Sequence, residues 1–209
     1  KLYTCEVKKE VYIPALEKKN EGFMTAGQVQ YVCRAGNFKK RGLSYTGALK
    51  VLKVMLGYEY LWVNVRVKGG AYGCMCGFGK DGSSYFVSYR DPNLDDTVEI
   101  YEKAADAIAE YQADERTMTK YIIGAISGLD APMTPPTKGL FALAGYLAGI
   151  TEEMLQKERD EILSATVDDI RKLSSHVRAF MEDDQFCVIG NAGKIKEEEK
   201  KFKKIENLF

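Results

Sequence analysis

The sequence predicts an α+β domain with two layers: a largely antiparallel sheet, and helices packed on one of its faces. Three observations predict it. Residues 27–36 alternate between apolar and polar side chains, and an Asp-Gly pair joins two strand-like runs at 71–79 and 83–90. Helical spacing dominates from about residue 93 to 182, before a short apolar run at 186–191. This order of strand, helix, hairpin, several helices and strand is typical of one α+β domain.

The first 26 residues show no clear periodicity. We expect residues 1–26 to be a lead-in or a linker from a preceding domain, so that the folded domain covers 27–209. Within the lead-in, VYIPAL (11–16) is a candidate extended piece, because Pro14 restricts the residue before it to extended geometry.

The first predicted strand covers 27–36 and ends at Gly36. A helix then begins near Ser44–Thr46, whose hydroxyls can cap it, and it carries an apolar stripe at helical spacing. Gly57 is expected to break or bend this helix, and YEYLWVNVRV (58–67) to continue it for a further turn or two. The stripe consists of Ala48, Leu49, Leu52, Met55 and Leu56.

A hairpin follows, with strands at 71–79 and 83–90 joined by a Lys-Asp-Gly turn (80–82). Glycine weakens a strand, so several glycines on one face suggest a bulge or another backbone lying close. A bent strand packed under a helix is an equally good interpretation. The glycines on that face of the first strand are Gly73, Gly77 and Gly79.

The helical part begins after the hairpin. Asn93 is expected to cap the next helix and Asp114 to open another. The Gly/Pro-rich segment 127–139 is interpreted as an internal connection. Thr166 and Asp169 fit a capping box. The remaining helices are expected at about 137–149, 152–164 and 167–182.

The C-terminal part is expected to hold one strand and one helix. FCVIGN (186–191) is a short apolar strand bounded by a Gly-Asn pair. KIKEEEKKFKK (194–204) is predicted to be a charged helix with a solvated face.

Charge and hydropathy argue against several classes of function. Thirty cations balance thirty anions, so there is no electrostatic reason to expect a nucleic-acid partner or an anionic membrane surface. No apolar run reaches about 18 residues, so no transmembrane helix is predicted. The start, KLYTCEVKKE, lacks an apolar signal core and an initiator Met, and we expect the chain to be cut from a longer protein.

The numbers of histidines and cysteines further limit the chemistry that this chain can perform. The only histidine, His176, is interpreted as an ordinary helix residue, because catalytic zinc sites usually draw on two or three histidines. The sequence therefore predicts no metal site in this chain. Five cysteines without a framework spacing indicate reduced thiols in a reducing compartment. Cys74 and Cys76 form a weak metal signal and are interpreted as small buried side chains.

The stretch from Arg66 to Tyr72 holds the candidate chemistry. It is not a phosphate loop, because it runs from a helix into a strand and lacks the final Lys-Ser/Thr. Arg66 offers planar donors that stay charged, and Tyr72 offers a phenol O–H. Gly69 and Gly70 allow a sharp turn, so both side chains can converge on an oxyanion, with Lys68 adding positive charge. The structural alternative is a buried salt bridge for Arg66 and a Tyr72 packed on the sheet.

Longer motifs resemble presequence proteases of the pitrilysin/insulinase superfamily. The resemblance covers nearly the whole chain from about Gly27 onward, and its most specific block is RVKGGAYG (66–73). The stretches that carry it are YTGAL (45–49), YLWVNVRVKGGAYG (60–73), YFVSYRDPNL (85–94), ADERTMTKYIIGAIS (113–127), the segment 156–171 and the segment 187–195.

The resemblance implies a large zinc peptidase of four related α+β domains, of the pitrilysin or mitochondrial processing peptidase type, that closes around an unfolded peptide. It implies that this chain is the C-terminal, non-zinc domain and is inactive alone. The zinc would be bound through a His-x-x-Glu-His motif, which does not occur here. It also implies that Arg66 and Tyr72 are catalytic residues at the scissile carbonyl, with Lys68, Gly69 and Gly70 binding substrate.

The partners implied are a peptide substrate and the sister domains of the same polypeptide. We therefore expect an exposed apolar surface meant for those domains. The bacterial cytoplasm is the expected compartment, with an organellar matrix as the alternative. Two other functions stay open: a non-catalytic scaffold domain of the same fold, and a nucleotide or small-ligand domain, which rests on glycine content alone.

Overall fold

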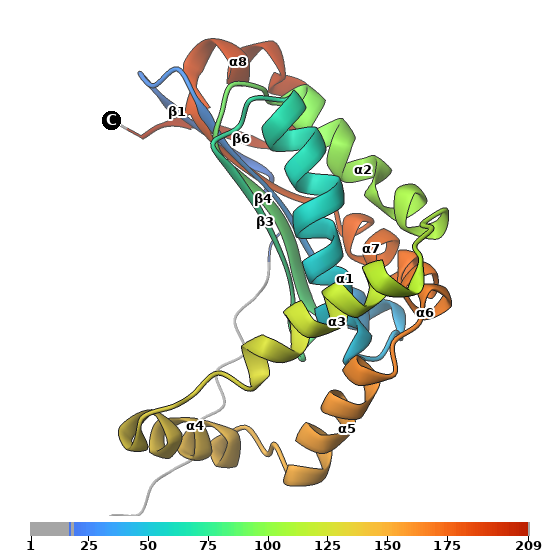
Figure 1. Cartoon of the computed structure of the whole chain (residues 1–209). Coiled ribbons are helices and arrows are strands. Elements are labelled where there is room, and N and C mark those ends of the chain that lie inside the picture. The colour runs from blue at the N-terminus through green and yellow to red at the C-terminus, as the bar shows by residue number, and fades with distance from the viewer. Residues whose placement is uncertain (1–16, 18, 209) are drawn as a thin grey trace, which may run out of the picture.

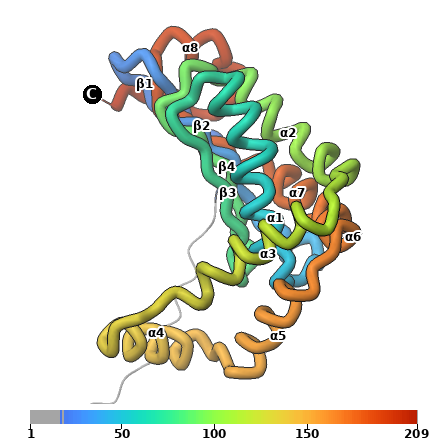
Figure 2. The backbone as a smooth tube through the Cα atoms, viewed as in Figure 1, coloured from blue at the N-terminus to red at the C-terminus, as the bar shows by residue number. Residues whose placement is uncertain are grey.

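The protein folds as the predicted α+β domain, with helices packed on one face of a single sheet (Figure 1, Figure 2). The computed structural model describes residues 17 and 19–208. The candidate extended piece VYIPAL (11–16) lies outside these residues. Within these described residues, six strands lie in the order β3-β4-β2-β5-β1-β6.

The predicted hairpin and the two predicted apolar strands are confirmed. β2 (Gln30–Asn37), β3 (Gly73–Phe78), β4 (Ser83–Asp91) and β5 (Gln185–Asn191) form the antiparallel part of the sheet. The turn at 80–82 ends on Gly82, whose φ of 90° lies in the left-handed region that glycine tolerates.

Two further strands pair in parallel. β1 (Glu21–Thr25) lies between β5 and β6 (Lys204–Asn207) and is parallel to both. β1 falls within the expected lead-in, so the sheet starts earlier than residue 27. The expected charged helix is shorter than predicted: α8 (Ala192–Glu197) ends early, and a 3-10 turn (Glu199–Lys201) leads into β6.

Phe202 explains why the C-terminal segment returns to the sheet. Its ring stacks on Phe186 at 5.1 Å between centroids. It also lies so near Gly22 that a Cβ added there would be 3.1 Å from the ring. Apolar packing of Phe202 therefore outweighs the helical tendency of the charged segment around it.

Gly57 does not break the first helix, and its predicted continuation through 58–67 is confirmed. α1 (Ala48–Met55) continues through two π-helical segments, Leu56–Tyr60 and Trp62–Lys68. The predicted apolar stripe is buried against the sheet and neighbouring helices. A π-helical turn widens the helix and is frequent at functional sites. Here Arg66 lies in the second π-helical segment.

The remaining helices follow the prediction closely, with one division. Asp114 caps α3 by accepting a hydrogen bond from the Thr117 amide at 2.8 Å, and Thr166 and Asp169 form the predicted capping box. The single helix expected over 167–182 is two helices that meet at Leu173. The helices are α2 (Asp95–Ala109), α3 (Glu115–Leu129), α4 (Pro135–Leu147), α5 (Glu152–Leu163), α6 (Val167–Lys172) and α7 (Ser174–Met181).

The prediction that Asn93 caps α2 is wrong. The Asn93 side chain instead donates to the Gly69 carbonyl at 2.6 Å, which ties the start of α2 to the end of the first helix. Buried Asp91 stabilises the turn before α2. Its carboxylate accepts hydrogen bonds from the Asn93 backbone amide at 2.9 Å and from the Thr97 hydroxyl at 2.8 Å. Burial raises the pKa of Asp91, although these hydrogen bonds oppose the shift.

The core lies between the sheet and the helices that cover it. Phe86 of β4 is fully buried and packs against Phe180 at 5.1 Å and Tyr101 at 5.5 Å between ring centroids. Because Phe180 belongs to α7 and Tyr101 to α2, this aromatic cluster joins two helices to the hairpin that carries the candidate site.

α4 confirms the expected exposed apolar surface. None of its residues is buried, and Figure 1 shows it projecting below the sheet as an arm between α3 and α5. Five large apolar side chains point into solvent: Leu140, Phe141, Leu143, Tyr146 and Leu147. In the described part of the chain, no helix has both the length and the apolarity needed to cross a membrane.

Candidate functional site

The candidate residues lie at the turn between the end of the first helix and β3, the edge strand of the sheet. The Gly70 amide donates to the Arg66 carbonyl at 2.9 Å, and the Ala71 amide to the Val65 carbonyl at 3.1 Å. Gly70 has a φ of 81°, and a Cβ on Gly69 would lie 2.6 Å from the Val65 carbonyl oxygen. Both glycines are therefore needed by the turn itself.

Arg66 is held by an aromatic ring. Its guanidinium carbon lies 3.9 Å from the ring centroid of Trp62, one turn earlier on the same helix, and 5.8 Å from the ring centroid of Tyr72. Within the described residues Arg66 makes no ion pair, so the buried salt bridge of the structural alternative is not observed. A half-buried guanidinium stacked on a ring keeps its N–H donors available at the rim.

Tyr72 lies near two guanidinium groups. Its ring is 5.8 Å from the guanidinium carbon of Arg90 as well as of Arg66, and it packs edge-on against Tyr89 at 5.2 Å. The side chain is 58% exposed. The structure thus brings Arg66 and Tyr72 together, so that a guanidinium and a phenol O–H can approach the same oxygen atom.

Two residues of this cluster were not predicted from the sequence: Trp62 and Arg90. The spacing of four residues between Trp62 and Arg66 on one helix was an available signal. The sequence contained no such signal for Arg90. This residue comes near Tyr72 only through the pairing of β3 with β4, where Tyr89 lies opposite Gly73. Arg90 has a φ of 50°, a conformation that costs energy for a residue with a side chain.

Lys68 lies at the exposed end of the first helix. Its Nζ donates to Oδ1 of Asn64, one turn earlier, at 3.2 Å. The structure therefore places an exposed cation two residues after Arg66, at the end of the first helix.

Cys74, Cys76 and the single histidine, His176, have the surroundings of structural residues. Burial raises the pKa of Cys74 to about 11, although the Arg66 charge opposes the shift, and burial raises the pKa of Cys76 to about 12. His176 Nε2 lies 2.9 Å from the Ser44 carbonyl oxygen, and its ring packs on Phe38. Among the described residues no three His, Cys, Asp or Glu side chains are grouped to hold a metal, so they do not fit a zinc ion.

The glycine face of β3 is covered by tyrosines of the neighbouring strand. A Cβ on Gly73 would be 2.9 Å from the Tyr89 ring, and one on Gly77 would be 2.5 Å from the Tyr85 ring. Gly73 and Gly77 therefore make room for aromatic side chains, whereas a Cβ on Gly79 would lie 2.3 Å from the Asp81 carboxylate and 3.1 Å from the Ser83 carbonyl oxygen.

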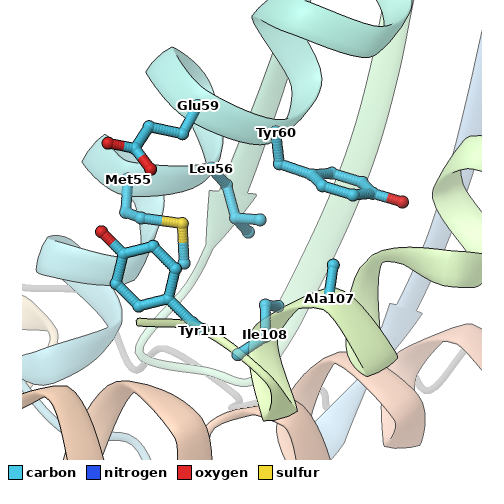
Figure 3. Close-up of a pocket in the computed structure, with 7 residues that line it drawn as sticks. All are labelled: Met55, Leu56, Glu59, Tyr60, Ala107, Ile108 and Tyr111. Carbon is cyan, nitrogen blue, oxygen red and sulfur yellow. The ribbon is translucent and has the colours of Figure 1, made fainter. Parts of the chain in front are cut away.

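The cavities lie beside the candidate site rather than in it. A pocket of about 160 Å³ between the first helix and α2 is lined by none of the five predicted site residues (Figure 3). Its walls are Met55, Leu56, Glu59, Tyr60, Ala107, Ile108 and Tyr111. A larger groove of about 480 Å³ between the first helix and α3 includes Trp62 and Cys74 in its wall, and therefore adjoins Arg66.

Sequence comparisons agree on one family. The profile of the family described as the PreP C-terminal domain matches residues 20–191. Protein HypA of Clostridium perfringens is 47% identical over 204 residues, covering 98% of this chain and 21% of that protein. Presequence protease 1, chloroplastic/mitochondrial, of Arabidopsis thaliana is 36% identical over 163 residues, covering 78% of this chain and 15% of that protein. The chain thus spans about a fifth or less of the length of these relatives.

Solved structures show the same fold. The inactive peptidase domain of a putative zinc protease from Bordetella parapertussis superposes with a TM-score of 0.59 at 12% identity, over 79% of this chain and 91% of that one. Pitrilysin superposes with a TM-score of 0.55 at 13% identity, over 82% of this chain and 19% of that one.

Proposed function

This chain belongs to the family of presequence protease C-terminal domains, and from that premise we propose that it forms the non-metal wall of a peptide-cleaving chamber. The observation that carries the proposal is the Arg66–Tyr72 pair at the free edge of the sheet. Its guanidinium and phenol lie together, and within the described residues no carboxylate neutralises the guanidinium. A charged donor left without an internal anion is suited to an anion supplied from outside.

In the proposed mechanism, Arg66 and Tyr72 donate hydrogen bonds to the scissile carbonyl oxygen as it becomes negative. Trp62 stacks on Arg66 and fixes its direction, and Arg90 flanks the Tyr72 ring. Donors held in place before the reaction stabilise the transition state more than the substrate. Each such donor contributes on the order of 3 kcal/mol.

Lys68, Gly69 and Gly70 are proposed to contact the substrate without taking part in the chemistry. The Gly69 and Gly70 amides already donate to the Asn64 and Arg66 carbonyls, so these glycines contribute space for the peptide rather than donors. The Lys68 ammonium can approach an anionic group of the peptide from the solvent side.

The metal is proposed to belong to another domain. The described residues do not fit zinc, and a solved neighbour of this fold is described as the inactive domain of a putative zinc protease. The nucleophile and the general base are therefore assigned to the part of the longer protein that this chain does not contain.

The scaffold function is the second candidate, and the exposed α4 supports it equally well. An apolar arm can join sister domains whether or not the chain takes part in catalysis. The two functions differ in what they predict for Tyr72.

Tyr72→Phe in the full-length protein removes one O–H and keeps the ring that packs on Tyr89. We expect kcat to fall by about tenfold or more with KM nearly unchanged, because the lost hydrogen bond forms in the transition state. Steady-state cleavage of a fluorogenic peptide measures both constants. Tyr58→Phe, on an exposed tyrosine of the helix that carries Arg66, is the matched control. Full activity in Tyr72→Phe favours the scaffold function.

α4 is proposed to dock on a sister domain of the same polypeptide. Leu140→Glu and Leu147→Glu place a charge on its exposed face. In the isolated chain we expect a change in unfolding free energy of no more than about 0.5 kcal/mol, because both side chains are in water. In the full-length protein we expect a loss of about 2 kcal/mol or more, because the charge is then buried. Urea unfolding of both forms tests this, and equal effects in the two forms contradict the docking.

We keep the bacterial cytoplasm as the proposed compartment, since the HypA relative comes from a bacterium. Fractionation of cells that make the full-length protein tests it, and recovery in a membrane or secreted fraction contradicts it.

A further inference from the structure

Two cysteines face each other across the centre of the sheet. Cys33 of β2 lies directly opposite Cys187 of β5 in an antiparallel pairing. Residues directly opposite in such a pair point to the same face, with Cα atoms about 4.5 to 5.5 Å apart. That spacing lies within the range of about 4.4 to 6.8 Å that a disulfide spans. The backbone therefore already holds the two residues in the spacing of a crosslink.

The helices cover one face of the sheet (Figure 1), and both thiols lie on the other face. Their strand neighbours Val32 and Val188 are fully buried on the helix side, so the cysteines point the other way. Both cysteines are half-buried and free, and both line a hollow of about 210 Å³. A small oxidant can reach them there.

The other described cysteines lack this arrangement. Cys74 and Cys76 lie on one strand, opposite Ser88 and Phe86, so neither has a thiol across from it. Cys76 is also buried. The opposed arrangement in the described part of the chain therefore belongs to Cys33 and Cys187.

The electrostatics of the pair agree with this proximity. Burial raises the pKa of Cys33, and the nearby Cys187 raises it further, as two thiolates at close range repel each other. Burial also raises the pKa of Cys187, with a contribution from Glu21 on the neighbouring strand. A raised pKa leaves little thiolate at neutral pH, so oxidation of this pair is expected to be faster in a mildly alkaline buffer.

We propose that Cys33 and Cys187 form a reversible cross-strand disulfide that ties β2 to β5 when the protein meets a low-molecular-weight disulfide such as oxidised glutathione. One protein thiolate attacks a sulfur of the oxidant, forming a mixed disulfide and releasing one thiolate of the oxidant. The second protein thiolate attacks the protein sulfur of that mixed disulfide and releases the other. The protein loses two electrons and two protons, and the oxidant is reduced to two thiols.

The bond would close a loop that contains most of the domain, because β3, β4 and all the helices from α1 to α7 lie between the two cysteines. A crosslink of this span restricts the unfolded chain strongly. We therefore expect oxidation to raise the Tm by about 5 °C or more, and dithiothreitol to reverse the rise.

The test uses the whole 209-residue chain in a mildly alkaline glutathione buffer, followed by acid quenching and peptide mapping by mass spectrometry. The expected product is a peptide pair joined through Cys33 and Cys187, formed in wild type and in the control Cys74→Ala. Cys33→Ala and Cys187→Ala are expected to lose both that product and the Tm rise. Glutathione attached separately to each cysteine, or a wild-type map in which both thiols stay free, overturns the proposal. The wild-type map decides the question even if a variant folds poorly.

Discussion

Arg66→Ala in the full-length protein is expected to lower kcat for peptide cleavage by about 10²–10³-fold while KM changes only a few-fold. Arg66 is the charged member of the pair at the edge of the sheet, and its guanidinium is stacked on Trp62 with no carboxylate partner in the described residues. Its donors are therefore free to meet the negative oxygen of the tetrahedral intermediate. Steady-state cleavage of a fluorogenic peptide by both proteins gives the two constants.

Two variants make this result specific. Arg116→Ala removes an exposed arginine of α3 and is expected to leave both constants unchanged. Arg66→Lys keeps the charge but loses the planar donor pair, so its kcat is expected to lie between those of the wild type and Arg66→Ala. An Arg66→Ala enzyme with raised KM and unchanged kcat would assign Arg66 to substrate binding instead.

The isolated chain is expected to cleave no peptide, even with added zinc. Its described residues contain no grouped ligands for the ion, and His176 already contacts the Ser44 carbonyl. Stabilising an oxyanion does nothing without a nucleophile to create it. Peptide turnover is measured over a range of zinc concentrations.

The full-length protein at the same molar concentration is the control for this comparison. Its turnover is expected to stop when a chelator is added. Turnover by the pure isolated chain that a chelator also abolishes would show that the metal chemistry lies within these residues.

Local signals in the sequence predicted local structure well. The hairpin follows from alternation and the Asp-Gly turn, and the start of α6 follows from the Thr166–Asp169 capping box. The nearness of Arg66 and Tyr72 was also predictable, because only a glycine turn separates the helix end from β3. Each of these features depends on residues that are close in the chain.

Features that depend on distant contacts were not predictable in the same way. β1 and β6 are short and pair in parallel with partners far along the chain, so alternation gave no signal for them. Asn93 looked like a helix cap, but a hydrogen bond to Gly69 uses its side chain. Arg90 joins the site only through strand pairing. In each case tertiary contacts outweighed a local preference.

The structure also gives a physical reason for parts of the family resemblance outside the site. Buried Glu158 of α5 accepts a hydrogen bond from the Tyr45 hydroxyl at 2.6 Å, and Glu161 accepts one from the Gly47 amide at 2.6 Å. A Cβ on Gly47 would be 2.3 Å from the Glu158 carbonyl oxygen. The YTGAL stretch therefore fastens α5 to the start of the helix that carries Arg66.

The central claim is that Arg66 and Tyr72 bind the transition state more tightly than they bind the peptide. Inhibition of the full-length enzyme by a phosphinic peptide, whose tetrahedral anion mimics that state, tests it most directly. The inhibition constant should rise in Arg66→Ala and Tyr72→Phe by the same factor by which kcat/KM falls. An inhibition constant that stays at the wild-type value while kcat/KM falls would contradict the claim.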